Sequence, residues 1–204
     1  MVHTDTWLMP SEMRLYDDRK RRLYINAAER ERFVAAAGGA PPEVRSFCLT
    51  LLYTGCRLSE ALELTPASVQ LQGRVISFRT LKKRRRHVMR EVPIPAALAR
   101  LLEETHGLEG EGAGPGPLWR HGAAPLNRST GYRWIKAVMA RAGIEGAQAS
   151  PKGLRHGYGI HAIRMGVPLN MLSKWMGHAA LSTTAIYANA SGREELEIAD
   201  RMWG

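Results

Sequence analysis

One stretch of the sequence, residues 150–189, concentrates residue types that suit chemistry on a phosphate group. Lys152 lies three residues before Arg155, His178 follows a glycine, and Tyr187 lies nine residues after that histidine. Attack on a phosphodiester develops negative charge on its non-bridging oxygens, which preorganised cations and N–H donors can stabilise. Arginine offers a planar fork to two phosphate oxygens, and the phenol of tyrosine can form a covalent ester. The stretch therefore predicts phosphoryl transfer with Tyr187 as nucleophile.

A second arginine, Arg57, lies far upstream but in a setting that would hold it in place. Gly55 ends a predicted helix, and a short helix starts at Ser59-Glu60 with apolar residues behind it. A guanidinium between two core helices is restrained, so Arg57 is a candidate for a second phosphate ligand. Taken alone, an arginine that caps the carbonyls of the preceding helix would explain the same pattern.

A basic run separates two segments with the alternation of β-strands. Val75, Ile76 and Phe78 form the first segment, and residues 88–94 form the second. The run between them consists of Lys82, Lys83, Arg84, Arg85, Arg86 and His87. The pattern predicts a β-hairpin whose tip neutralises backbone phosphates, and from which a lysine could protonate the leaving 5′ oxygen. A solvated charge run is the alternative interpretation.

Helices must position these groups, and local signals mark where they begin. Asn26 and Glu29 form the pattern of a capping box, and Pro41-Pro42 opens a helix with one apolar face. Asn127 precedes a helix whose basic residues Arg133 and Lys136 could face DNA. Three further helices follow residue 151, and the third carries Tyr187 about one turn after its start. The predicted fold class is mainly α with a small antiparallel β-hairpin (α+β).

Composition limits the classes of protein that fit. The chain has 204 residues, of which 45% are hydrophobic and 24% charged, so we expect one globular domain. Its net charge of +10 favours a polyanionic partner. The apolar runs are too short for a membrane span and the N-terminus does not resemble a signal peptide, so a cytoplasmic location is expected. Cys48 and Cys56 are expected to be buried thiols, and no P-loop or metal-site motif is present.

Three segments resemble the motif boxes of the tyrosine recombinase (phage integrase) family. They are TGCRLSEALEL (54–64), SPKGLRHGYG (150–159) and MGHAALSTTAIY (176–187), and they occur in the family's order. The resemblance implies the fold of that family's catalytic domain, with residues 26–204 as one catalytic domain. Residues 1–25 would be a basic arm or lead-in, and residues 191–204 a helical tail that packs against a neighbouring protomer.

The resemblance also implies a role for each site residue. Arg57 and Arg155 resemble the two arginines that clamp the phosphate, and His178 resembles a donor to it. Tyr187 resembles the nucleophile. The family's general acid is a lysine in the β-hairpin, for which Lys82 is the better match and Lys83 the rival. The family requires no metal, cofactor or ATP.

Two departures from the family pattern bear on function. Lys152 occupies a position where the family usually has histidine, and lysine is a poor base unless its pKa is lowered. His156, next to Arg155, resembles a supporting residue of the family. Most relatives also carry a separate DNA-clamping domain before the first arginine, so an accessory DNA-binding protein or the residues around Arg19–Arg22 would complete the clamp.

The implied activity is site-specific recombination through a 3′-phosphotyrosyl intermediate, in the bacterial cytoplasm or nucleoid. Double-stranded DNA would be the partner, and pairwise strand exchange implies four protomers on two paired sites. Two alternatives stay open: a DNA-binding regulator of the same fold without catalysis, and relaxation of supercoils in the manner of a type IB topoisomerase.

Overall fold

A computed structural model describes residues 14–79, 89–109, 114–189 and 193–203, which form a mainly helical fold with small antiparallel sheets. The α-helices are α1 (Ala27–Gly38), α2 (Pro42–Thr54), α3 (Leu58–Leu62), α4 (Ala96–His106), α5 (Arg128–Arg141), α6 (Pro151–Arg164), α7 (Leu169–Met176), α8 (Leu181–Ala185) and α9 (Arg193–Ala199). The 3-10 helices are η2 (Pro66–Ser68), η3 (Ile186–Asn189) and η4 (Asp200–Met202). The strands are β1 (Val69–Gln70), β2 (Val75–Arg79), β3 (Met89–Pro93), β4 (Arg120–His121) and β5 (Ala124–Pro125). The predicted α+β class is confirmed.

Local capping explains where the helices that frame the site begin and end. The side chain of Asn26 accepts a hydrogen bond from the backbone N–H of Glu29 at 2.9 Å, and the Glu29 carboxylate accepts one from the N–H of Asn26 at 2.9 Å. Helix α2 ends at Gly55, whose φ of +60° is a conformation that other residues rarely adopt. Helix α6 starts after Ser150, whose hydroxyl accepts from the N–H of Gly153 at 3.1 Å.

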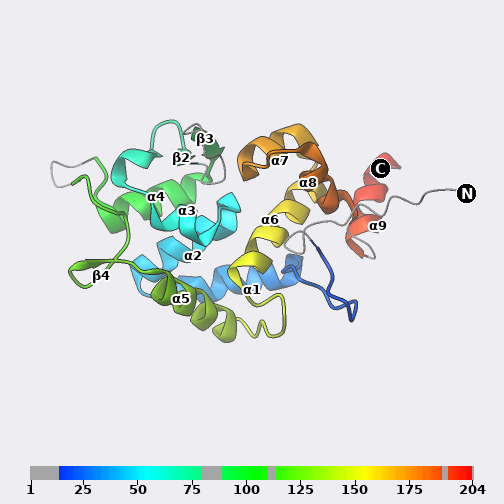
Figure 1. Ribbon diagram of the computed structural model, residues 1–204, viewed down its shortest axis with the longest axis horizontal. Coiled ribbons are helices and arrows are strands. Elements are labelled where there is room, and N and C mark those ends of the chain that lie inside the picture. Colours follow the sequence, from blue (N-terminus) through cyan, green and yellow to red (C-terminus); the bar gives the residue numbers. More distant parts are fainter. Residues whose placement is uncertain (1–13, 80–88, 110–113, 190–192, 204) are drawn as a thin grey trace, which may run out of the picture.

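Helix α6 is the central element of the fold. In Figure 1 it lies between the group formed by α2–α5 and the group formed by α7–α9, and it packs on α2, α7 and α1. It also joins two hydrophobic clusters: Leu154 belongs to the larger one, whereas Tyr158 and Ile160 belong to a smaller one that contains Tyr187. Both hydrophobic clusters of the molecule therefore include residues of α6.

The larger sheet has the strand order β1-β2-β3, with both pairs antiparallel. In the pairing of β2 with β3, Phe78 lies opposite Arg90 and Arg79 lies opposite Met89. The two strands of the predicted hairpin are therefore confirmed. Residues 80–88, which join them and carry the basic run, lie outside the described residues.

The segment before α1 is partly built into the body of the protein. Leu15 and Tyr24 are buried in the smaller cluster, and Arg22 binds the carboxylate of Glu29, with its Nη2 2.9 Å from Oε1. At least Arg22 is thus engaged in the fold rather than in a free arm. In the described parts of the chain, no helix is long and apolar enough to cross a membrane.

The helix near the end of the chain contacts α6 of the same chain. Glu197 on α9 forms an ion pair with Arg164 on α6. Leu196, Met202 and Trp203 remain 62%, 75% and 73% exposed, a large apolar exposure for so short a segment. Packing of this tail against a neighbouring protomer stays a prediction.

Candidate active site

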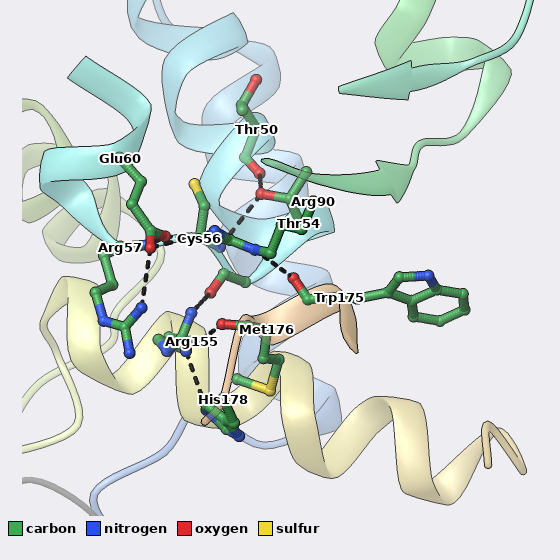
Figure 2. A network of polar contacts seen from close by, with 11 residues as sticks. Thr50, Thr54, Cys56, Arg57, Glu60, Arg90, Arg155, Trp175, Met176 and His178 are labelled. Atoms are coloured by element: carbon green, nitrogen blue, oxygen red, sulfur yellow. Dashed lines mark hydrogen bonds and ion pairs between the residues drawn. The ribbon is translucent and has the colours of Figure 1, made fainter. Parts of the chain in front are cut away.

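Arg155 is the residue on which the site converges. It lies on the second turn of α6, is only 8% exposed, and donates hydrogen bonds to backbone carbonyls of two other segments. Its Nη1 is 2.6 Å from the carbonyl of Gly55 at the end of α2, and its Nη2 is 2.8 Å from that of Met176 at the end of α7 (Figure 2). Burial and then the charge of Arg57 lower the pKa of Arg155 to about 10, so the guanidinium is still protonated at neutral pH.

Arg57 lies beside Arg155 and is held by a buried acid. The carboxylate of Glu60 accepts hydrogen bonds from the backbone N–H of Arg57 at 2.8 Å and from its Nη1 at 2.9 Å. The Arg57 side chain is 30% exposed, whereas that of Glu60 is completely buried. The Arg57 side chain is therefore partly exposed to solvent. Its role as a phosphate ligand stays a prediction.

His178 lies next to Arg155, and its hydrogen bonds define which ring nitrogen carries the proton. Nε2 is 3.0 Å from Nη2 of Arg155, and a guanidinium can only donate, so Nε2 accepts. Burial and then Arg155 lower the pKa of His178 to about 3, which keeps the ring neutral at neutral pH. Its single proton is thus on Nδ1, which donates to the hydroxyl of Thr184 at 2.7 Å. For Nε2 to donate to a phosphate, this arrangement has to change.

Tyr187 is close to these cations, but its hydroxyl points into the core. It is 0% exposed, and its ring stacks on that of His178 with centroids 6.2 Å apart and an interplanar angle of 20°. Its hydroxyl lies 3.2 Å from Nδ1 of His156, on α6. Burial raises the pKa of Tyr187 to about 12, against the opposing effect of Arg155 and Arg57, so the phenol is protonated.

The chain around Tyr187 differs slightly from the expected third helix. Helix α8 ends at Ala185, and Tyr187 lies on the 3-10 helix η3 that continues from it. The ring packs directly on Gly159 of α6, where a Cβ would lie 2.7 Å from three ring carbons. The absence of a side chain at Gly159 is what allows Tyr187 to approach α6 so closely.

The remaining predicted residues are placed less directly. Lys152 is exposed on the first turn of α6, and it contributes, after burial, to the lowering of the pKa of His156 to about 3. It is therefore near His156, but its share in activating Tyr187 stays a prediction. The hairpin residues Lys82, Lys83, Arg84, Arg85 and Arg86 lie outside the described residues, so their roles also stay predictions.

Arg133 and Lys136 are exposed on α5, close to the segments that carry the site. Nη2 of Arg133 is 3.0 Å from the hydroxyl of Thr130, on the first turn of α5, which packs on α3. Nζ of Lys136 is 2.9 Å from the carbonyl of Ala149, just before α6. Lys136 thus contacts the segment just before the helix that carries Arg155, whereas Arg133 contacts its own helix. Contact of either side chain with DNA stays a prediction.

Sequence reasoning missed three residues that support the site: Glu60, Arg90 and Thr184. Glu60 was named as the start of a helix, but not as the anion that binds Arg57. Arg90 occupies an inward position of β3, where alternation predicts an apolar residue. The hydroxyl of Thr184 accepts a hydrogen bond from Nδ1 of His178. The spacing of Glu60 three residues after Arg57, on one helix face, is the signal that could have found the first of them.

Comparison with known proteins agrees with this architecture. Residues 23–194 match the phage integrase family. Among curated relatives, the tyrosine recombinase XerC of Rhizobium meliloti (strain 1021) is 36% identical over 156 residues, which are 75% of this chain and 48% of that protein. A tyrosine recombinase of Thermosipho africanus (strain TCF52B) is 28% identical over 152 residues, which are 74% of this chain and 51% of the relative. The chain thus spans about half the length of these relatives.

Solved structures show the same fold. The crystal structure of XerA recombinase matches with a TM-score of 0.75 and 24% identity, covering 89% of this chain and 65% of the other. The XerH site-specific recombinase, bound to its difH substrate in a pre-cleavage complex, matches with a TM-score of 0.72 and 20% identity, covering 93% of this chain and 60% of the other. The fold is that of tyrosine recombinase catalytic domains. The chain belongs to the phage integrase family.

Proposed function

We propose that this protein is a site-specific DNA recombinase that cuts and rejoins strands through Tyr187. The observation that carries the proposal is the convergence of Arg57, Arg155, His178 and Tyr187, from three segments, around one partly solvent-facing guanidinium. Two adjacent guanidinium groups form an anion site, and a phenol beside them supplies a nucleophile for phosphorus. The matches to tyrosine recombinases, one of them in a pre-cleavage DNA complex, support the same conclusion.

In the proposed reaction the phenolic oxygen of Tyr187 attacks the scissile phosphorus and the bond to the 5′ oxygen breaks. The phenol gives its proton to the neutral form of Lys152 or to water, and the 5′ oxygen gains one from a hairpin lysine, Lys82 or Lys83. Arg57 and Arg155 stabilise the charge on the non-bridging oxygens of the transition state. The product is a 3′-phosphotyrosyl ester and a free 5′ hydroxyl. Attack by the 5′ hydroxyl of a partner strand reverses the step. Because the phosphotyrosyl ester conserves the energy of the broken phosphodiester bond, no ATP is consumed.

The buried hydroxyl of Tyr187 implies that the free protein is not ready to cleave. Its nearest polar partner is His156, which lies on the core side of α6 and is only 2% exposed. A phosphate bound at Arg57 and Arg155 replaces the contact between Arg155 and His178 and leaves Nε2 of His178 free. We infer that binding of DNA turns Tyr187 away from His156 and toward the phosphate.

Strand exchange between two duplexes requires more than one protomer, and we infer four on two paired sites. The exposed Leu196, Met202 and Trp203 offer an apolar surface through which the tail could join neighbouring protomers. An accessory DNA-binding protein could add to the grip of this chain on DNA. Action in the bacterial cytoplasm or nucleoid remains part of the proposal.

The decisive experiment traps the covalent ester. Nicked duplexes tiled from the DNA that flanks the gene would be incubated with the protein, because a nick just past the cleavage point lets the short 5′-hydroxyl fragment diffuse away. We expect an SDS-resistant, protease-sensitive adduct on some duplexes. Tyr187→Phe should abolish it, whereas Tyr132→Phe, at an exposed tyrosine on α5, should leave it intact.

Other outcomes would favour the alternatives. If the protein binds DNA but forms no adduct on any duplex, the result would contradict catalysis and favour a DNA-binding regulator. An adduct accompanied by relaxation of supercoiled plasmid without any second site would favour a topoisomerase-like activity. An adduct that survives in Tyr187→Phe would show that another residue is the nucleophile.

A further inference from the structure

Arg90 is an arginine in the core of the protein, next to the site but absent from the predicted constellation. It is the second residue of β3 and points to the buried side, where it is 5% exposed. Its guanidinium carbon lies 4.9 Å from the centre of the Phe78 ring on the paired strand. Burial of a guanidinium is costly unless its donors are all directed to acceptors, so its partners decide what it does.

The first partner of Arg90 is the acid that holds Arg57. The two carboxylate oxygens of Glu60 accept hydrogen bonds from Nη2 of Arg90 at 2.7 Å and from Nη1 at 3.3 Å. The same carboxylate accepts from the backbone and side chain of Arg57. Although burial raises the pKa of Glu60, Arg90 and then Arg57 lower it further than burial raises it, so the acid is ionised. Arg90 therefore fixes the anion that orients Arg57.

The second partner of Arg90 is the turn that precedes His178. Nε of Arg90 donates to the carbonyl of Trp175 at 2.8 Å, next to the Met176 carbonyl bound by Arg155 (Figure 2). A Cβ at Gly177 would lie 3.1 Å from Cδ of Arg90, so the Arg90 side chain packs directly against this turn. Two buried guanidinium groups thus bind the consecutive carbonyls of Trp175 and Met176 at the end of α7. These residues directly precede Gly177 and His178.

We propose that Arg90 is a positioning residue that sets the geometry of Arg57, through Glu60, and of the turn that carries His178. The inference rests on the proposed strand-cleavage function. Lysine in place of Arg90 keeps the charge, but its three N–H donors lie on one nitrogen, so it cannot span both carboxylate oxygens and the Trp175 carbonyl as the three nitrogens of the guanidinium do. The expected consequence is a site that binds DNA but stabilises the transition state poorly.

The test compares Arg90→Lys with the wild-type protein on a nicked duplex that traps adduct. Because misplacement of a catalytic group by about 1 Å can lower rates about 100-fold, we expect single-turnover cleavage at saturating DNA to fall about 10- to 100-fold. The DNA dissociation constant should change by less than about threefold, since the net charge is kept. Arg79→Lys is the matched control: Arg79 lies on the adjacent strand and pairs with Glu63, but at the surface. It should cleave at the wild-type rate.

A substrate with a neutral methylphosphonate at the scissile position separates positioning from a general loss of structure. Its transition state carries one negative charge less, so cleavage depends less on Arg57. If Arg90 acts through Arg57, the defect of Arg90→Lys should shrink on this substrate in the same proportion as that of Arg57→Lys. An equal defect on both substrates, or a wild-type rate on both, would overturn the inference. If circular dichroism shows that Arg90→Lys does not fold, Glu60→Gln, which keeps the shape of the acid, replaces it in the test. Its cleavage defect should likewise be smaller on the methylphosphonate substrate.

A measurement without DNA keeps the two proposals distinguishable. In a ¹⁵N-labelled protein, the side-chain signals of Arg57 and His178 should shift in Arg90→Lys and stay in place in Arg79→Lys. If the wild-type protein traps no adduct on any duplex, the proposed function fails, while these shifts still support the positioning role of Arg90. Unchanged signals of Arg57 and His178 would overturn the positioning role even if the wild-type protein cleaves DNA.

Discussion

The imidazole of His156 connects the candidate nucleophile to the buried interior. Its Nδ1 is 3.2 Å from the Tyr187 hydroxyl, while its Nε2 is buried and has no hydrogen-bond partner in the described structure. Burial, and then Lys152 and Arg155, lower its pKa from 6.5 to about 3. The folded protein thus holds a neutral ring, which the unfolded chain would protonate below pH 6.5.

The first prediction at the residue scale is a loss of stability in mild acid. Because the folded pKa lies below the unfolded value, the contribution of His156 is fully present above pH 6.5 and is lost as the pH falls toward 3. The slope per histidine is about 1.4 kcal/mol per pH unit. Between pH 7 and pH 5 we expect the unfolding free energy of the wild-type protein to fall about 2 kcal/mol more than that of His156→Gln.

Chemical denaturation at the two pH values would check this prediction. His121→Gln, at an exposed histidine, is the control and should follow the wild-type protein. If the unfolding free energy of His156→Gln fell as much between pH 7 and pH 5 as that of the wild-type protein, the prediction would be wrong. Protonation of the His156 ring would then cost no stability, and its contact with Tyr187 would not require the neutral ring.

At the scale of elements, helix α6 shows how a glycine, which has no side chain, lets the candidate nucleophile pack closely against a helix. Gly159 lets the ring of Tyr187 lie against the helix, and the ring forms part of the smaller hydrophobic cluster. The position of η3 therefore depends on tight packing against α6 rather than on its own short run of hydrogen bonds.

The second prediction concerns this packing. Gly159→Ala would place Cβ 2.7 Å from the Tyr187 ring, so we expect a loss of about 1–3 kcal/mol in unfolding free energy by overpacking. This is the opposite of the gain of up to about 1 kcal/mol that alanine normally gives in a helix. Gly38→Ala, at the end of α1 with nothing within 4 Å of the new Cβ, should be neutral or stabilising. Urea denaturation of both variants decides, and a stabilised Gly159→Ala would contradict the packing of Tyr187 on α6.

Elements were predictable from sequence where local signals define them. Asn26, Gly55 and Ser150 mark helix ends because capping depends on neighbouring residues only. The pairing of Arg90 with Glu60 was not predictable, because the two residues are 30 positions apart and the chain offers many other arginines. The residue types at the site were predictable from motifs, whereas the inward direction of the Tyr187 hydroxyl depends on tertiary packing that no motif encodes.

At the scale of the whole molecule, a net charge of +10 would make the proposed binding to DNA sensitive to salt. Neutralised phosphates release counterions, so each phosphate contact adds about 0.9 to the slope of the logarithm of affinity against the logarithm of salt concentration. Exposed cations near the site, such as Arg133 and Lys136, are the candidates for such contacts.

The third prediction follows from that slope. Arg133→Gln and Lys136→Gln should each reduce its magnitude by about 0.9, and should weaken binding to different DNA sequences equally. Arg100→Gln, at an exposed arginine on α4, is the control and should leave the slope unchanged. Fluorescence anisotropy over a range of salt concentrations measures both quantities. A sequence-dependent loss would instead assign these side chains to contacts with base edges.

The hydrogen bond from Arg155 to the carbonyl of Gly55 joins residues that are 100 positions apart in the chain. A contact of this span can form only after both ends have been synthesised. On the ribosome, the loop with Arg57 emerges first, the helix of Arg155 much later, and Tyr187 last of the three. If the proposed function is correct, an incomplete nascent chain cannot break DNA, and the capacity to cut arises only together with the folded protein.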